Sequence, residues 1–328
     1  MSDAHAQEPN IMGIPLPNGK LAMWFFLVTE IMFFTALIGT YLILRNSIPN
    51  DPAGLIKWPT PKQVHLSEPI GAFNTFVLIA SSLTVVLAHY AAGKGNMKHA
   101  TMYIGITTFL GLVFLGVKGL EYQAKIEHDI LPGHMGELLP GMSTARQKQF
   151  HNVGMQYVER VREQLKHTIE HATGKAMADV KDADVQQTSE LVQDCYSLFN
   201  RMNGVLRDAA GGTKTYTSPL SPAEVGGEVN EILHKQHEML DDGRIKKDEV
   251  HLSPAIPYGN MWSSCYFAMT GFHALHVLGG IVIFVIILGM GLMNKLGPQH
   301  EGMLEITGLY WHFVDIVWIF LFPLLYLV

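Results

Sequence analysis

Five long apolar runs constrain the fold of this chain more than any other feature of its sequence. They cover Leu21–Leu44, Pro69–Ala92, Ala100–Tyr122, Met261–Met293 and Ile306–Val328. A helix needs about 20 mostly apolar residues, each rising ~1.5 Å, to cross the ~30 Å hydrocarbon core of a bilayer. Each run is long enough to do so. The sequence therefore predicts five membrane-spanning helices.

Charged residues are concentrated between the third and fourth runs. Of the 52 Asp, Glu, Lys and Arg residues, 35 lie between Gln123 and Pro257, and the rest of the chain carries the other 17. So few charges cannot cover a water-facing surface. We expect an all-α, polytopic membrane helical bundle with one extramembrane, mostly helical insert. The predicted parts are an N-terminal tail over 1–20, three helices over 21–122, the insert over 123–257 and two helices over 258–328.

The insert has the apolar spacing of amphipathic helices. Apolar residues recur at intervals of three and four over 143–171 and again over 182–207, which predicts two helices. A third helix is predicted over 221–240. It starts with a capping box made by Ser221 and Glu224, with Pro222 at the first helical position. We expect the three helices to bury one small core.

Composition excludes several classes of function. The net charge of −6 and the pI of about 6.2 provide no basic field for phosphates, so no nucleic-acid partner is expected. Cys195 and Cys265 lie far apart, which excludes a disulfide framework and a cysteine-rich metal site. Met1–Gly19 lacks a basic segment followed by a short apolar stretch, so we expect no secretory signal peptide.

Basic residues in the short loops favour one orientation by four to three. They fall on two sides of the membrane: Lys20, Lys94, Lys98 and Lys295 on one, and Arg45, Lys57 and Lys62 on the other. Because Lys and Arg concentrate in cytoplasmic loops, we expect the N-terminus to lie in the cytoplasm. The insert would then lie outside.

Glu30 is an ionisable residue inside the first predicted span. It follows Lys20 by ten residues, which places it roughly 15 Å into the bilayer. An ionised side chain is costly at this depth, so a protonated carboxyl that donates a hydrogen bond is favoured. Two interpretations remain open. Glu30 is either a proton-accepting or lipid-contacting group, or a neutral carboxyl bonded to a neighbouring helix.

Polar residues spaced three apart occur in three of the other spans. The pairs are Lys118 with Glu121, His273 with His276, and His312 with Asp315. This spacing puts both members of a pair on one helix face. Lys118 and Glu121 are expected to form an ion pair, with a direct role in chemistry as the alternative.

The two histidines of one span raise the question of a metal. His273 and His276 cannot be opposite axial ligands of one haem, because they project from the same face of one helix. They could share a small metal ion only with ligands from other helices. The candidates for these ligands are Glu30, His89, His312 and Asp315. The alternative is an interhelical hydrogen-bond network or contact with lipid headgroups.

Histidine pairs in the insert also have spacings that permit metal binding. They are His167 with His171, and His234 with His237. No HExxH motif or cysteine pair accompanies them, so we interpret both pairs as solvated helix faces. The chain also lacks a glycine-rich phosphate loop and a nucleophile elbow. We predict neither a catalytic residue nor a metal site.

Five segments of the spans resemble the motifs of cytochrome c oxidase subunit III, in that family's order. They are Leu27–Phe34, Asn74–His89, Leu120–Tyr122, Tyr266–Val277 and Trp311–Trp318. The insert has no counterpart in the family pattern. The usual member has seven spans, and the first two have no counterpart here. Those two help to enclose a cleft that holds phospholipid, so in this chain the cleft would be absent or completed by another subunit.

The resemblance implies an accessory role in aerobic respiratory electron transport. In the family, the haems and coppers belong to subunits I and II. Subunit III packs against subunit I, holds structural phospholipid and keeps proton uptake fast. This chain would then bind no redox cofactor and would lie in a bacterial-type inner membrane, with its insert and C-terminus on the outer side. The insert could also contact cytochrome c or a neighbouring respiratory complex.

The resemblance also implies roles for individual residues. Those that would support proton uptake or contact lipid are Glu30, His89, Glu121, His273, His276, His312 and Asp315. Three alternatives stay open. The chain could be subunit III of a quinol oxidase or a nitric oxide reductase, an independent haem- or metal-binding membrane redox protein, or a small transporter that uses Glu30.

Overall fold

The five apolar runs form five long helices in the computed structural model, which describes residues 18–48, 57–137, 151–203, 205–207, 213–215 and 220–327. They are α1 (Asn18–Asn46), α2 (Glu68–Gly93), α3 (Met97–Glu127), α9 (Gly259–Leu292) and α10 (Glu301–Phe322). The short turn η2 (Pro298–His300) precedes α10, and the π-helical turn η3 (Pro323–Leu327) follows it. Each of the five is long and apolar enough to cross a membrane, which confirms the predicted helical membrane bundle.

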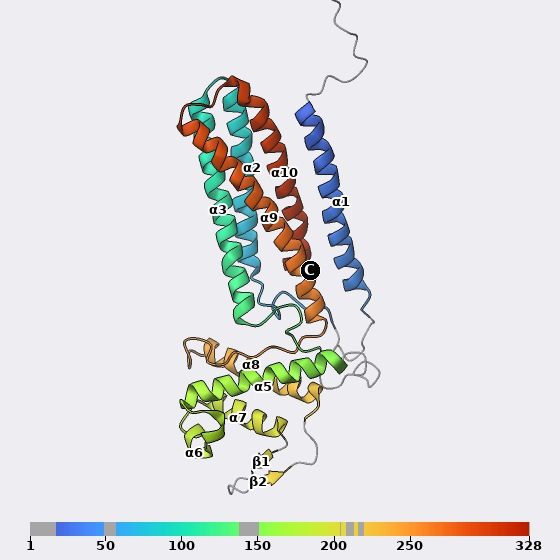
Figure 1. The fold of residues 1–328 in the computed structure, drawn as a ribbon, viewed down its shortest axis with the longest axis vertical. Helices are drawn as coiled ribbons and strands as arrows, with labels where there is room; N and C mark the ends of the chain where they lie inside the picture. The colour runs from blue at the N-terminus through green and yellow to red at the C-terminus, as the bar shows by residue number, and fades with distance from the viewer. Residues whose placement is uncertain are drawn as a thin grey trace, which may run out of the picture.

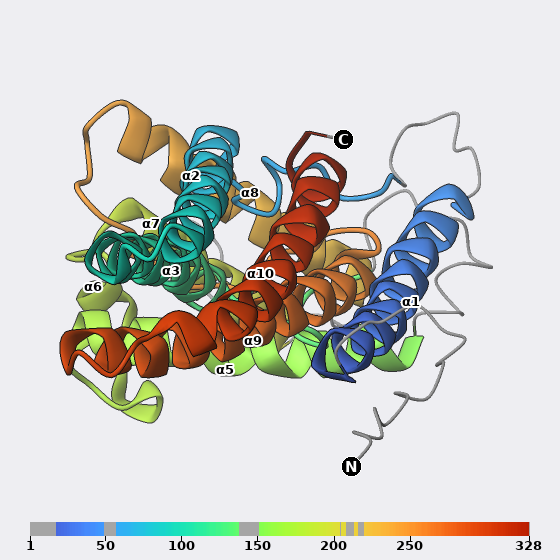
Figure 2. The ribbon, with the colours of Figure 1, turned by 90° about the horizontal axis from the view of Figure 1, so that it is seen from above.

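The spans pack in three layers. α2 and α3 form one layer, α9 and α10 form the next, and α1 stands on the far side of α9 and α10 (Figure 1, Figure 2). The last span is central, because 56% of its most apolar window is buried, against 6% for α1. α1 therefore contacts the bundle along one narrow side. Its large apolar residues Trp24, Phe25 and Met32 remain exposed.

Glycines let the central helices approach closely. A Cβ at Gly280 of α9 would lie 2.7 Å from the ring of Trp311 in α10, and one at Gly111 of α3 would lie 3.0 Å from the same ring. Trp311 is fully buried, and its indole N–H donates to Ser81 Oγ of α2 at 2.9 Å. Helices in lipid are held together by close packing rather than by exclusion of water, so these small residues stabilise the bundle.

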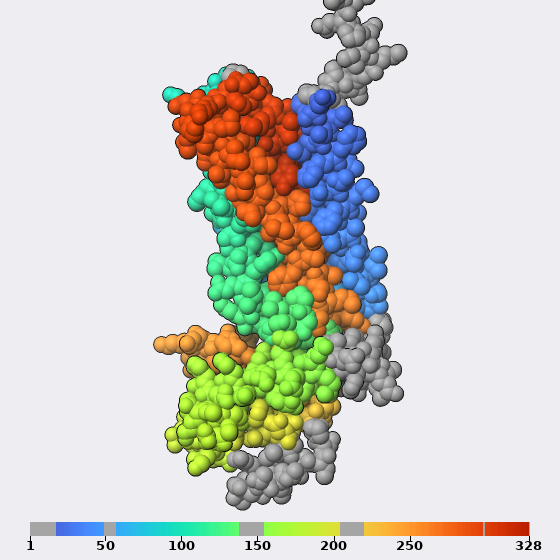
Figure 3. Space-filling model, in the orientation of Figure 1, coloured from blue at the N-terminus to red at the C-terminus, as the bar shows by residue number. Residues whose placement is uncertain are grey.

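Between α3 and α9 the chain forms a helical module that lies below the spans in Figures 1 and 3. Its helices are α5 (His151–Thr173), η1 (Met177–Asp179), α6 (Asp182–Val185), α7 (Glu190–Met202) and α8 (Pro222–Asp241). Apolar side chains of α5, α7 and α8, among them Leu165, Leu191 and Val229, form its core. The strands β1 (Val205–Arg207) and β2 (Thr213–Thr215) pair antiparallel.

The predicted capping box of α8 is present. Ser221 Oγ accepts from the Glu224 N–H at 3.3 Å, and a Glu224 carboxylate oxygen accepts from the Ser221 N–H at 2.7 Å. The two side chains thus satisfy backbone donors that the first turn of a helix leaves free.

Other parts of the insert differ from the predicted pattern. α3 continues to Glu127, past the expected boundary at residue 123. The single helix predicted over 182–207 is wrong, because Ser189 caps a new helix, α7, by accepting from the Val192 N–H, and 205–207 is a strand. The helix predicted over 143–171 and the tail over 1–20 lie partly outside the described residues.

The two connections between the insert and the spans run side by side. Gly136 and Ala255 form a parallel bridge, flanked by backbone hydrogen bonds of 3.0 and 2.9 Å. The buried carboxylate of Glu137 accepts from the N–H groups of Tyr258 and Asn260, at the start of α9, at 2.8 and 3.1 Å. Both ends of the insert are therefore held at the same place.

Cys195 offers a test of the insert core. Its side chain is fully buried in α7, and burial raises the pKa of the thiol to about 12. Because the thiolate is the reactive form, an alkylating reagent should modify Cys195 in a Cys265→Ser background only when the insert unfolds. A Ser197→Cys variant in that background, exposed on the same helix, should react at once. Equal rates at the two positions, followed by mass spectrometry, would contradict the buried core.

Candidate functional site

Glu30 of α1 and His276 of α9 meet near the middle of the membrane-spanning part. Glu30 Oε2 lies 3.0 Å from His276 Nε2, and the side chains keep 21% and 18% of their surface exposed. Both residues are close to the centres of their helices. A second polar link, between Lys20 and Glu305 at 2.7 Å, joins one end of α1 to α10. Both Glu30 and His276 were candidates from the sequence, and the structure makes them a pair.

The hydrogen bonds around His276 fix where its protons lie. Its Nδ1 is 2.7 Å from the carbonyl oxygen of Phe272. A carbonyl can only accept, so Nδ1 carries a hydrogen. Nε2 then shares one proton with Glu30: either a protonated carboxyl donates to the imidazole, or an imidazolium donates to the carboxylate. Tyr310 donates to the His276 carbonyl at 2.8 Å and holds this turn against α10. The pair is a half-buried site for one proton.

Lys118 and Glu121 form an ion pair inside the bundle. Their charged atoms are 2.9 Å apart, and the side chains are 3% and 10% exposed. Tyr266 of α9 and Tyr326 of η3 both donate to the Glu121 carboxylate, and the Lys118 ammonium donates to their hydroxyls at 3.2 and 3.1 Å. The ammonium also lies 5.1 Å from the ring of Trp318. Three chain segments are thus joined through one buried pair of charges.

Two of the predicted residues are buried and lack partners among the described residues. Neither ring nitrogen of His273 and neither carboxylate oxygen of Asp315 has a hydrogen-bond partner in that part of the chain. His273 lies beside the rings of Phe114 and Trp318, with centroids 5.6 and 5.0 Å away. Such groups are rare in proteins. Their role stays a prediction.

The remaining predicted residues lie outside these two pairs. His312 Nδ1 is 2.6 Å from Ser82 Oγ, which links α10 to α2, and His89 is half-buried on α2. Across the described ranges, no three His, Cys, Asp or Glu side chains are placed to hold a metal ion as they stand. The metal site considered from the sequence therefore does not assemble from Glu30 and the span histidines in this part of the chain.

Tyrosines are the functional neighbours that the sequence analysis missed. Tyr266 and Tyr326 complete the Lys118–Glu121 pair, and Tyr310 supports His276. The Lys118–Glu121 spacing could have pointed to these tyrosines, because a buried ion pair needs further hydrogen-bond donors to balance the cost of its desolvation. Aromatic hydroxyls in neighbouring spans are the groups best able to supply them.

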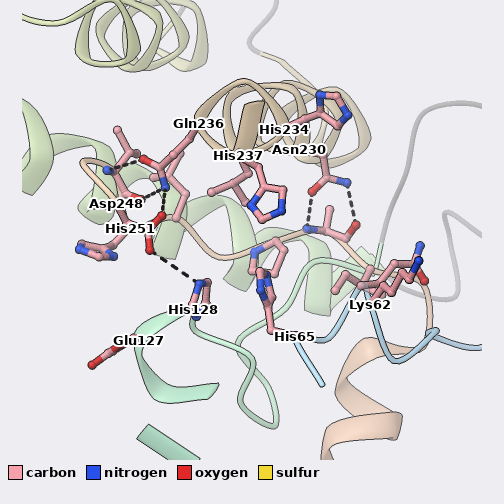
Figure 4. A pocket seen from close by; sticks show the side chains of 17 residues that line it. Lys62, His65, Glu127, His128, Asn230, His234, Gln236, His237, Asp248 and His251 are labelled. Atoms are coloured by element: carbon pink, nitrogen blue, oxygen red, sulfur yellow. Dashed lines mark hydrogen bonds and ion pairs between the residues drawn. The ribbon is translucent and has the colours of Figure 1, made fainter. Parts of the chain in front are cut away.

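A cleft between the spans and the insert was also missed. It has a volume of about 320 Å³ and lies among the loop 57–67, the end of α3, α8 and residues 248–256. Five histidines line it: His65, His128, His234, His237 and His251 (Figure 4). His234 is 76% exposed, in keeping with a solvated face. No local spacing could have grouped these histidines, because they come from separate segments.

The histidines of the cleft are in close contact. The ring of His65 stacks on that of His128 with centroids 4.1 Å apart, and His237 lies edge-on to His65 at 6.4 Å. Desolvation in the cleft lowers the pKa of His65 to about 4, although part of the residue is exposed, and the nearby His128, Lys125 and His237 act in the same direction. Lys125, at the end of α3, donates to the His65 carbonyl at 2.8 Å and holds the loop in place.

A known protein family matches the membrane-spanning part of this chain and leaves out most of the insert. The family model described as "Cytochrome c oxidase subunit III" matches residues 15–135 and 249–328. These ranges contain all five helices that are long enough to span a membrane in the described part of the chain. Residues 136–248, most of the insert, are outside the match.

Individual relatives match shorter stretches. The probable cytochrome c oxidase subunit 3 of Mycobacterium leprae is 41% identical over 75 residues, which are 23% of this chain and 35% of that protein. The cytochrome c oxidase subunit 3 of Thermostichus vulcanus is 44% identical over 73 residues, 21% of this chain and 34% of that protein. The probable quinol oxidase subunit 3 of Staphylococcus saprophyticus is 35% identical over 104 residues, 32% and 44% of the two chains. The matches therefore span less than half the length of these relatives.

Proposed function

Because this chain belongs to the cytochrome c oxidase subunit III family, we propose that it is the accessory, non-redox subunit of a haem–copper oxygen reductase supplied with electrons by cytochrome c. Oxygen reduction and proton pumping take place in subunits I and II, which hold the haems and coppers in this proposal. The task of this chain is to stabilise subunit I and to support proton uptake.

The observation that carries the proposal is the one-proton site of Glu30 and His276. Ionisable residues inside a membrane protein are costly, and they mark proton or ion pathways. The shared proton can pass between the carboxyl and the imidazole without changing the net charge of the pair, so a low-dielectric site can hold it. Both side chains are partly exposed, so a proton-conducting group of a neighbouring subunit can reach them.

The surface of α1 supports a partner on the same side. Among the spans this helix packs mainly against α9 and α10, and it leaves a row of large apolar side chains exposed. An exposed apolar face of this size suits a neighbouring membrane subunit or bound phospholipid. We place subunit I and structural phospholipid there, beside Glu30. The N-terminus lies in the cytoplasm and the insert on the outer side in this proposal.

Two rival functions can be separated by simple measurements. Likeness to a probable quinol oxidase subunit 3 makes a quinol-linked complex the first rival. A copper centre in the subunit II that co-purifies with this chain favours cytochrome c as the donor, and its lack favours quinol. The second rival is an independent redox protein. A haem Soret band in the purified chain would favour that rival over the accessory subunit.

Glu30→Ala tests the role of the one-proton site. In the purified oxidase complex, we expect a several-fold drop in proton-uptake rate or in the number of turnovers before inactivation, with unchanged haem spectra. The His276→Gln variant should show the same loss. Because the two residues hold one proton together, the double variant should be no worse than either single variant.

The matched control is Glu305→Gln, which alters a different polar link between α1 and the bundle, the ion pair with Lys20. It should leave proton uptake and turnover number near the unaltered values. Loss of haem from the complex in Glu30→Ala would contradict a supporting role. Equal effects of Glu30→Ala and Glu305→Gln would show that the pair only anchors α1.

A further inference from the structure

The histidine-lined cleft joins the two parts of the molecule. His65 belongs to the loop before α2 and His128 follows the end of α3, so both come from the membrane-spanning part. His237 on α8 and Asp248 come from the insert. Figure 4 shows these side chains pointing into the same space from the two sides. None of them belongs to the Glu30–His276 site.

Two acceptor atoms face each other across the cleft. His128 Nδ1 is 2.7 Å from the carbonyl oxygen of Ala124, so Nδ1 carries a hydrogen and the neutral ring has its lone pair on Nε2. That Nε2 lies 3.8 Å from Asp248 Oδ2. A protonated ring would form an ion pair with the carboxylate at this distance, which is too long for a hydrogen bond. Two ligands that each lie ~2 Å from one tetrahedral metal ion are about 3.3 Å apart, so His128 and Asp248 would close by roughly half an ångström around the ion.

The carboxylate of Asp248 is held in place by a buried glutamine. Gln236 Nε2 donates to Asp248 Oδ1 at 3.0 Å and leaves Oδ2 free to face His128. The amide of Gln236 is itself fixed, because its oxygen accepts from the N–H groups of Glu249 and Val250 at 3.1 and 2.8 Å. Gln236 is only 5% exposed. Metal-binding carboxylates and imidazoles are oriented by such outer hydrogen bonds, and here both His128 and Asp248 have one.

A third donor is within reach. Imidazoles that share one ion at a metal–nitrogen distance of ~2 Å have ring centroids about 5 Å apart. The ring of His65 is stacked on that of His128 with centroids 4.1 Å apart, so it would have to turn about its side-chain torsions to share an ion with His128. Lys125 donates to the His65 carbonyl and holds the backbone of this residue while its ring turns.

We propose that this cleft binds a divalent transition metal ion of the zinc class, through His128 Nε2, Asp248 Oδ2 and the ring of His65. Two imidazoles and one carboxylate, with a water completing the tetrahedron, are a ligand set that zinc accepts. The ion would fasten the insert to the spans, since His65 and His128 belong to one part and Asp248 to the other.

The test is a titration of the full chain in detergent, purified without a histidine tag, with Zn²⁺ by calorimetry and with Co²⁺ by visible absorption. One equivalent should bind, and cobalt should show the absorption bands of a tetrahedral site. His128→Ala, Asp248→Asn and His65→Ala should each weaken binding by at least about tenfold. The Cys195 alkylation assay checks that each variant remains folded.

The matched control is a double variant, His167→Ala with His171→Ala. These histidines are exposed on α5, and their spacing would also permit metal binding. The control should bind the metals as tightly as the unaltered chain. Lack of stoichiometric binding would overturn the proposal. Binding that survives His128→Ala and Asp248→Asn but disappears in the variant His167→Ala with His171→Ala would also overturn it.

Discussion

Replacing Glu121 by alanine is expected to lower the free energy of unfolding by about 3–5 kcal/mol, the usual loss when one partner of a buried ion pair is removed. The Lys118 side chain is 3% exposed, and its ammonium would be left without its counter-charge. The hydroxyls of Tyr266 and Tyr326 would still accept from it, but they carry no negative charge. The readout is the midpoint of thermal unfolding in detergent, together with the yield of folded protein.

A double variant and a surface variant test the reason for this loss. Lys118→Met combined with Glu121→Gln removes both charges and should recover most of the stability, because uncharged side chains of similar volume can replace a buried pair. Lys235→Ala removes a partly exposed cation that lies 2.6 Å from both Glu190 and Asp194. It should cost less than about 1 kcal/mol. Equal losses for Glu121→Ala and Lys235→Ala would show that burial of the charge is not the cause.

Gly280→Leu is expected to destabilise the bundle by about 1–3 kcal/mol or more, the cost of overfilling a packed core. A Cβ at this position would already lie 2.7 Å from the Trp311 ring, which is fully buried and cannot move aside. α9 and α10 would have to separate, which would also strain the hydrogen bond from Tyr310 to His276. We expect a lower unfolding midpoint and, in the proposed oxidase complex, a partial loss of the proton uptake that we propose for Glu30.

Gly289→Leu is the matched control for this prediction. It lies on the same helix, and an added Cβ there would meet nothing within 4 Å. Its unfolding midpoint should stay close to that of the unaltered chain. If both substitutions lowered the midpoint equally, the change in helix propensity or in lipid contact would explain the loss, and the close approach at Trp311 would not.

The fold of the membrane-spanning part could be predicted because the lipid bilayer permits so few backbone structures. Inside a bilayer every backbone polar group must be paired within its own segment, so an apolar run of sufficient length forms a helix whatever surrounds it. The insert lies in water, where that constraint is absent. The apolar stripe over 182–207 continues across Gln186–Ser189, and only the capping side chain of Ser189 shows that a new helix starts there. Local capping outweighs periodicity at such points.

The site was predictable where its partners are close in sequence. Lys118 and Glu121 lie one helix turn apart, and their contact follows from helix geometry. Glu30 and His276 are 246 residues apart, so the sequence singled out each residue by its cost in lipid but could not pair them. His65, His128 and Asp248 are also far apart in sequence, so their proximity could not be predicted either. Their meeting depends on how the insert folds back onto the spans, which no local pattern encodes.

The side-by-side ends of the insert have a consequence for how such a chain can be altered. Segments whose ends lie together can be added to or cut from a fold without rerouting the rest of the backbone. The bridge between Gly136 and Ala255 brings the ends of the insert together in this way. The whole appendage could therefore be excised and the gap closed by a few residues, with the spans keeping their topology. By the same logic it could be grafted onto another membrane subunit that offers two neighbouring helix ends.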